Sequence, residues 1–298
     1  MTNKHLDYHP EKTQIIFFDL EFYVPEKDRE GRRELKANPY KEGHFLIGGT
    51  FTKYFPMLPN NDKRNVTKEF WIWDYKSDEK TMLADILKFI DESWKLIYKS
   101  NNQAELFYAG IGIQRADIQY LFARSKKYKL KSESELFDIF YKGRFLDFEN
   151  IFIPLFKNKG NMLKTKSTHD IIKKFNIETE RKASTGIWEQ FDSKEYNLIK
   201  KRNNTEVADL LTIYKKFIIY MHFKEVHERY SPKVIEDIQN LLKSDDFDFL
   251  INCYKEMDDG WYILRTNLDD RQKKILCTIE NKIQKKKAKK KNQKEGSE

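Results

Sequence analysis

The segment TQIIFFDLEFY, residues 13–23, combines a run of apolar β-forming residues with two acids that stand two positions apart. Such a run predicts a buried strand. Because successive side chains of a strand point to opposite faces, Asp19 and Glu21 share one face near the carboxyl end. Two adjacent negative charges need compensation, which a divalent cation commonly supplies. The alternative is a strand that simply ends in solvated acids, and this segment alone does not decide between them.

Strand-like and helix-like segments alternate along the first half of the chain. Further strands are predicted in HFLIGGTFTKYF, with a break at Gly48-Gly49, in KEFWIWD, in AELFYAGIG and at the start of GRFLDFENIFIPLF. Apolar residues recur at helical spacing in residues 77–100, where Ser77 is the expected N-cap. Helices are also predicted in QRADIQYLFARSKKY, in STHDIIKKFNI and over residues 192–226. This order is typical of an α/β layered domain.

Composition excludes several classes of protein. No apolar run approaches the ~20 residues that a membrane span needs, and MTNKHLDYHPEK lacks the apolar segment of a signal peptide. The two cysteines, Cys253 and Cys277, form no CxxC pattern, which argues against a disulfide framework or a zinc site. We therefore expect a cytoplasmic protein without a membrane partner.

The net charge of +9 is unevenly distributed. Residues 284–298 hold seven lysines against two glutamates, which leaves +4 for the rest of the chain. We predict a disordered lysine-rich tail over 284–298, preceded by a helical extension over 223–283 and a larger domain over 13–222. The tail could attract nucleic acid, or it could serve only to keep the chain in solution.

Asp117 is the first acid that could join Asp19 and Glu21. The strand AELFYAGIG ends at Ala109 or Gly110, and Asp117 stands in the first turn of the next predicted helix. An acid in that position is often only a favourable partner of the helix dipole. Because this strand is expected beside the first one, Asp117 is predicted to lie near the other two acids.

Glu206 and Asp209, in KKRNNTEVADLLTIYKKF, are the remaining candidates. They stand three residues apart on a predicted helix and therefore share a face. Convergence of carboxylates from several elements is what a metal-dependent phosphodiester hydrolase needs. Two Mg²⁺ ions about 4 Å apart can clamp both the attacking water and the leaving oxygen.

The segments FFDLEFY, YAGIGIQRADIQYL, FLDFENIF with STHDIIKKFNIE, and KKRNNTEVADLLTIYKKF together resemble the DEDD superfamily of 3′–5′ exonucleases. The nearest subgroup is the bacterial predicted exonucleases related to the proofreading domains of family B polymerases. The resemblance covers roughly residues 13–220. It implies a ribonuclease H-like fold, in which helices flank a mixed central sheet, here followed by a C-terminal helical extension. It also implies two Mg²⁺ or Mn²⁺ ions and a DNA or RNA 3′ end as substrate.

The resemblance also implies roles for the acids. Asp19 matches the acid that bridges both ions, Glu21 the ligand of the first and Asp117 the ligand of the second. Either Glu206 or Asp209 completes the set. Asp147 in FLDFENIF ranks below these residues, because the matching family acid is not usually a metal ligand.

The fourth motif departs from the family pattern Y-N-x-x-D-V. In RNNTEV, Arg202 stands where the family has tyrosine and Glu206 where it has the last aspartate. If Asp209 is aligned with the last family aspartate instead, Asn204 and Thr205 occupy the positions where the family has histidine or tyrosine. The residue that usually handles the attacking water is thus absent from its expected place, and Tyr196 and His169 are the candidates to replace it.

Contacts to nucleic acid are predicted for two kinds of side chain. Arg115 and Arg202 are candidate phosphate contacts. Phe22 and Tyr23 could stack on terminal bases, although ordinary packing of both rings is the interpretation that we favour. His44 and His169 have no second ligand at metal spacing, which favours structural roles for both.

Three functions remain open from the sequence. The leading hypothesis is a two-metal 3′–5′ exonuclease. The second is a catalytically weak or inactive nuclease-fold module that binds nucleic acid or a protein partner. The third keeps the fold and makes the enzyme an endonuclease.

Overall fold

The computed structural model describes residues 13–29, 37–56, 63–100, 105–153, 156, 167–180 and 186–229. The chain divides into two compact units, and every described strand lies in the unit that ends at Ile213. Of the predicted helical extension, only residues 223–229 are described. The rest of it and the predicted lysine-rich tail, 284–298, lie outside the described residues.

Five strands form one mixed sheet in the order β3-β2-β1-β4-β5. Strand β1 pairs antiparallel with β2 and parallel with β4, while β2–β3 is antiparallel and β4–β5 is parallel. The bounds are β1 Thr13–Tyr23, β2 Phe45–Tyr54, β3 Val66–Trp71, β4 Glu105–Gly110 and β5 Arg144–Asp147. The strand of the first two predicted acids is therefore the central strand.

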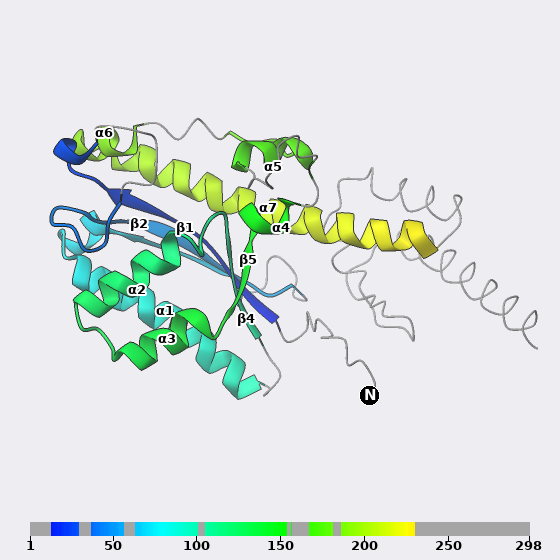
Figure 1. Ribbon diagram of the computed structural model, residues 1–298, viewed down its shortest axis with the longest axis horizontal. Helices are drawn as coiled ribbons and strands as arrows, with labels where there is room; N and C mark the ends of the chain where they lie inside the picture. The colour runs from blue at the N-terminus through cyan, green and yellow to red at the C-terminus, as the bar shows by residue number, and fades with distance from the viewer. Residues whose placement is uncertain are drawn as a thin grey trace, which may run out of the picture. The chain divides into compact units, whose positions relative to one another are not determined.

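Helices cover both faces of this sheet. Helices α1, α2 and α3 lie on one face, and the first half of α7 runs along the other (Figure 1). The helical bounds are η2 Glu26–Asp28, η3 Ile72–Tyr75, α1 Glu79–Ser100, α2 Asp117–Lys127, α3 Glu133–Tyr141, α4 Phe148–Ile151, α5 Thr168–Lys174, α6 Ile187–Asp192 and α7 Tyr196–Arg229. The predicted α/β layered class is confirmed as a mixed five-stranded sheet flanked by helices. Within the described ranges, no helix combines the length and apolarity needed to cross a membrane.

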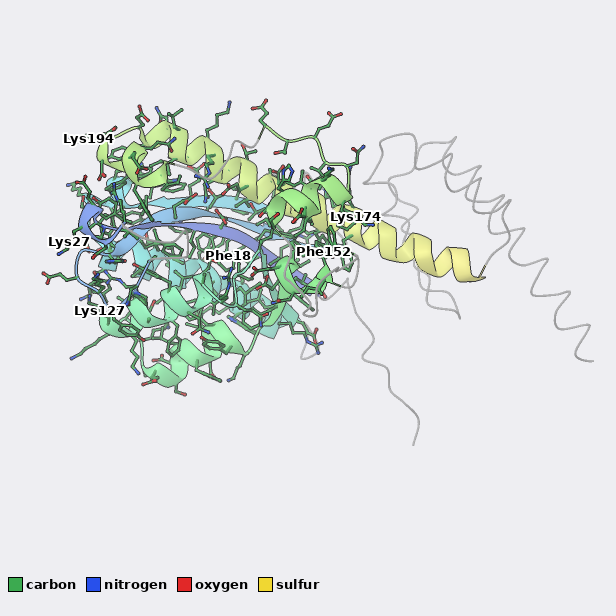
Figure 2. All side chains as sticks on the ribbon, turned by 45° about the horizontal axis from the view of Figure 1, so that its top comes forward. Phe18, Lys27, Lys127, Phe152, Lys174 and Lys194 are labelled. Atoms are coloured by element: carbon green, nitrogen blue, oxygen red, sulfur yellow. The ribbon has the colours of Figure 1, made fainter. Side chains whose placement is uncertain are left out.

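Alternate side chains of β1 build the core between the sheet and helices α1–α3. Phe18 and Leu20 are at most 5% exposed, and Phe18 lies in the interior of the molecule (Figure 2). Phe18 stacks on Phe51 of β2 at 5.2 Å, and Phe51 meets Phe89 of α1 edge-on. The intervening β1 positions, Asp19 among them, therefore face the layer that contains α7.

Gly48 and Gly49 lie within β2 and do not break it as predicted. Gly48 has φ +148°, a conformation that favours glycine. A Cβ on Gly49 would lie 2.4 Å from the carbonyl oxygen of Asp19. The glycine pair thus allows β2 to lie close to β1 beside the first predicted acid, with a register shift between Glu21 and Phe22.

The structure corrects the predicted start of one helix and adds a helix that was not predicted. Helix α1 begins at Glu79, and the N-cap is Asp78, whose Oδ1 accepts the N–H of Thr81 at 3.2 Å. Ser77 instead has φ +66° and stands outside the helix. Helix α3 was not predicted, although the capping box between Ser132 and Glu135 is visible in the sequence as S-x-x-E.

Candidate metal centre

Asp19 and Glu21 project from β1 toward α7, and Glu206 projects from α7 toward them. One carboxylate oxygen from each of the three residues lies within 4.8 Å of the other two. Glu21 and Glu206 are buried, whereas Asp19 is partly exposed. The central strand and the long helix thus form an acid cluster, defined here as Asp19, Glu21 and Glu206.

Asn203 joins α7 to the sheet at this cluster. Its buried side-chain Nδ2 donates to Asp19 Oδ2 at 2.8 Å and to the Asp19 main-chain oxygen at 3.2 Å. Its Oδ1 accepts the N–H of Thr50 in β2 at 2.9 Å. One amide therefore fixes the Asp19 carboxylate and docks the helix. The sequence analysis missed Asn203, and its only signal was its place about one turn before Glu206.

A second row of polar contacts continues from Thr50 toward β3. Thr50 Oγ1 donates to Asn204 Oδ1 at 2.6 Å, and Asn204 Nδ2 donates to Glu69 Oε1 at 2.7 Å. Lys200 Nζ lies 3.0 Å from Glu69 Oε2. Burial alone would raise the pKa of Glu69, but hydrogen bonds from Asn204 and Lys200 lower it overall. The negative charge of Glu69 is therefore compensated by Asn204 and Lys200.

Asp117 is the first residue of α2 and is 7% exposed. Burial raises its pKa to about 8, and the negative charges of Glu21 and Asp147 raise it too, against hydrogen bonds from its own backbone and that of Leu20. The charge of Asp117 in turn contributes to raising the pKa of Asp19. Asp117 is therefore close enough to interact electrostatically with Asp19 and Glu21, but among the described residues it is not in the group of acids at metal-binding distance. Its predicted role as a metal ligand stays a prediction.

Asp147 holds the loop that leads to Asp117. Its carboxylate, 2% exposed, accepts the N–H of Gly112 at 2.8 Å, of Gln114 at 3.1 Å and of Glu149 at 3.1 Å. Gly112 has φ +72°, the left-handed conformation that glycine adopts readily. The Asp147 oxygens are thus engaged by backbone groups, in agreement with its lower rank among the predicted ligands.

The acid cluster carries more negative charge than its surroundings compensate. Burial raises the pKa of Asp19 well above its ordinary value, and the charges of Glu206, Glu21 and Asp117 raise it further. A side-chain hydrogen bond between Asp19 and Glu206 also raises the pKa of Asp19. Mutual repulsion among these carboxylates is the condition that a bound cation relieves.

Arg202 lies at the edge of the cluster. Its Nε donates to Glu206 Oε1 at 3.2 Å, and its side chain is 15% exposed. Burial alone would lower the pKa of Arg202, but the charges of Glu21, Glu206 and Asp19 outweigh this and raise it. A guanidinium that was predicted to contact phosphate therefore faces the predicted metal ligands directly.

The structure separates the two candidates for the fourth acid. Among the described residues, the group of acids at metal-binding distance contains Glu206 and not Asp209. Asp209 is buried, and its Oδ2 accepts a 2.6 Å hydrogen bond from Thr179 Oγ1, in the segment after α5. Asp209 thus helps to attach that segment to α7.

The aromatic residues after the acids pack within the protein. Phe22 is 9% exposed and lies 4.4 Å from the ring of Tyr120, on the face opposite the acids. Base stacking is therefore wrong for Phe22, because its strand position points it into the core. Tyr23 is partly exposed, stacks on Phe45 at 4.7 Å and donates to Asp192 Oδ1 at 2.8 Å. These contacts engage both the ring and the hydroxyl of Tyr23.

Arg115 stands in the loop before α2 and is the more accessible of the two predicted phosphate contacts. Its side chain is 72% exposed, and its Nη2 lies 3.2 Å from Glu149 Oε1. The ion pair orients the guanidinium but leaves most of it open to solvent, two residues from Asp117.

Tyr196 does not reach the cluster, and His169 is outside the group of side chains at metal-binding distance in the part of the chain that the structure describes. Tyr196 stacks on Trp73 at 4.2 Å, and it lies roughly 15 Å from Glu206 along the α7 axis at 1.5 Å per residue. His169 is exposed in the first turn of α5. His44 is buried, with Nε2 at 3.0 Å from Asp28 Oδ2, and its Nδ1 accepts the N–H of Asn38.

The donor set of the cluster fits a hard divalent cation. Mg²⁺ and Mn²⁺ prefer oxygen ligands, and three carboxylates from two rigid elements supply them. The repulsion that raises the pKa of Asp19 would be relieved by a bound ion. Comparison of the chain with protein-family models and with curated proteins gives no match. The chemistry of this centre therefore rests on its own geometry: an acid cluster on β1 and α7, Asp117 beside it and a guanidinium at its edge.

Proposed function

We propose that the chain is a metal-dependent nuclease, and specifically a 3′–5′ exonuclease that hydrolyses terminal phosphodiesters of DNA or RNA. The observation that carries this proposal is the convergence of Asp19, Glu21 and Glu206 within 4.8 Å, with Asp117 beside them. The mixed sheet with antiparallel β2 and β3 and parallel β4 and β5 supports the ribonuclease H-like fold that the sequence resemblance implies.

Asp19, Glu21 and Glu206 would hold Mg²⁺ or Mn²⁺, which supplies a Lewis acid and lowers the pKa of water. The resemblance implies two such ions. Asn203 keeps the Asp19 carboxylate in one orientation through its 2.8 Å hydrogen bond. Asp117 holds a proton at neutral pH in the metal-free protein, because its pKa is raised to about 8.

Nucleic acid is the proposed partner of this centre. Arg115, two residues before Asp117 in the chain, has a largely exposed guanidinium, which would contact a phosphate of the substrate. A phosphate contact of this kind would carry no base specificity, which suits an enzyme that degrades many sequences.

Degradation of 5′-labelled DNA and RNA oligonucleotides in Mg²⁺ or Mn²⁺ tests the proposal. We expect a ladder of 3′-shortened products from the wild type and at least a ~100-fold slower reaction from Asp19→Asn and Glu21→Gln, since each variant removes a charged ligand from the metal centre. Asp138→Asn, at a half-exposed position of α3 away from the acid cluster, is the matched control and should retain the wild-type rate.

If Asp19→Asn and Glu21→Gln still gave the ladder of 3′-shortened products, the assignment of both residues to the active site would be wrong. If closed-circular substrates were cleaved at a rate similar to that of linear ones, the activity would be that of an endonuclease and not of an exonuclease. No reaction of the wild type on any substrate would favour the second candidate below.

The second candidate is a nuclease-fold module that binds nucleic acid or a protein partner without catalysis. The observation in its favour is Arg202, which supplies positive charge to the acid cluster from within the chain. A cluster balanced in this way has less need of an ion. The two candidates differ in whether Mn²⁺ binds and stabilises the wild type.

A further inference from the structure

Arg202 is placed to act as a cation of the metal centre. It stands one helical turn before Glu206, and its Nε donates to that carboxylate at 3.2 Å. The charges of Glu21, Glu206 and Asp19 all stabilise its charged form. The electrostatic interaction with Glu21 and Asp19 reaches from α7 to β1, so Arg202 does more than form an ion pair along its own helix.

The guanidinium also retains an unused donor. Among the described residues, Arg202 Nη1 is a buried atom that has no hydrogen-bond partner. A buried donor without a partner is costly, because it has lost its hydrogen bonds to water. A phosphate oxygen is a suitable acceptor for such a donor.

Charge balance limits what else the cluster can hold. Three carboxylates are balanced by one guanidinium and one divalent ion. A second divalent ion would add charge beside a guanidinium that is already held against Glu206, and like charges repel strongly at such distances when they are partly buried.

We propose that Arg202 takes the place of one of the two divalent ions implied for this centre, so that the native site binds a single Mg²⁺ or Mn²⁺ ion. The Arg202 guanidinium then supplies the second positive charge to a bound phosphate through its free Nη1. This inference rests on the proposed function, since it concerns the same centre, and it makes Arg202 a substrate-positioning residue.

The test is the number of Mn²⁺ ions bound by the full chain at neutral pH, measured by isothermal titration calorimetry and by electron paramagnetic resonance of the free ion. The wild type should bind one ion. Arg202→Gln should bind two, with the first roughly tenfold tighter than in the wild type, because a neighbouring positive charge has been removed. Arg202→Lys keeps the charge and should bind one.

Arg144→Gln is the matched control and should bind one ion, because its partner Glu105 lies at the start of β4, away from the cluster. Circular dichroism establishes that each variant is folded. If the wild type binds two Mn²⁺ ions, the inference is wrong whatever the variants show, but the proposed nuclease function is unaffected. An unchanged count in folded Arg202→Gln also overturns it.

Absence of binding separates the inference from the proposed function. No Mn²⁺ bound by either the wild type or Arg202→Gln overturns both the metal centre and the inference. No ion in the wild type and binding by Arg202→Gln would show that Arg202 replaces cations altogether, which contradicts the single-ion site and favours the non-catalytic module.

Discussion

Glu79 and the acid cluster differ in how far neighbouring groups compensate their negative charge. Glu79, at the start of α1, accepts hydrogen bonds from Arg124 Nε at 3.0 Å, from Arg124 Nη2, from the N–H of Leu46 at 2.8 Å and from Tyr128 at 2.8 Å. Glu79 and Arg124 are at most 5% exposed. The acid cluster instead sets three carboxylates against one guanidinium, which makes a single 3.2 Å hydrogen bond to Glu206.

This difference distinguishes a structural ion pair from a candidate metal centre. At Glu79 one charge meets one charge, and the surrounding donors satisfy both oxygens, so the pair connects α1, α2 and β2. At the cluster, burial and then the excess negative charge raise the pKa of Asp19. A bound cation would relieve such repulsion between carboxylates. Carboxylates with a strongly shifted pKa therefore mark candidate sites.

Removing the arginine from each group is the strongest way to test the comparison. Arg124→Ala should lower the free energy of unfolding by about 3–5 kcal/mol, because it leaves the Glu79 charge buried and unpaired. Mn²⁺ should not restore this loss. Arg202→Ala should cost less, since the acids can take up protons, and saturating Mn²⁺ should restore the loss.

Urea unfolding of both variants, with and without Mn²⁺, measures these values. The distinction would fail if Mn²⁺ stabilised the two variants equally, or if Arg202→Ala were the more destabilised of the two in the presence of the ion.

The pH dependence of stability is the next test. The pKa of Asp117 is raised to about 8 and that of Asp19 is also raised. The metal-free folded protein therefore binds more protons than the unfolded chain between about pH 5 and pH 8. Its free energy of unfolding should fall as pH rises through this window, by at least ~1 kcal/mol.

Thermal unfolding at several pH values in a chelator measures this slope. Asp117→Asn should flatten it, whereas Asp138→Asn should leave it unchanged. Saturating Mn²⁺ should abolish or reverse it, because the ion binds the ionised carboxylates. Stability that rises with pH in the metal-free protein would contradict the raised pKa values.

The smallest expected effect separates Asp209 from Glu206. Thr179→Val removes the 2.6 Å hydrogen bond to Asp209 and should cost ~1 kcal/mol of stability. It should leave Mn²⁺ affinity unchanged, whereas Glu206→Gln should weaken it at least tenfold, because a charged ligand is lost. Equal effects of the two variants on Mn²⁺ affinity would return Asp209 to the ligand set.

Local patterns in the sequence were sufficient to predict most of the fold. The apolar run of β1 and the helical spacing of α1 decided those elements before any tertiary contact was known. The capping box at Ser132 identifies α3 just as directly, but it was not used. Alternation along β1 also placed Asp19 and Glu21 on one face of the strand.

The rest of the site depends on how α7 docks, and no local pattern specifies that. Glu206 and Asp209 share a helix face, and only the position of the helix on the sheet brings Glu206 to the cluster. The role of Asn203 follows from its contacts with Asp19 and Thr50, which are far from it in the chain. Arg202 was recognised as a departure from a motif, but its contact with the acids required the structure.

The docking of α7 through Asn203 has a consequence for the order in which the protein matures. Synthesis delivers β1 early and α7 late, and domains generally fold as units. A nascent chain that has not yet reached α7 has Asp19 and Glu21, but it lacks both Glu206 and the amide that orients Asp19. The acid cluster is therefore incomplete in a nascent chain until α7 has packed on the sheet, and the proposed nuclease activity would begin only at that step.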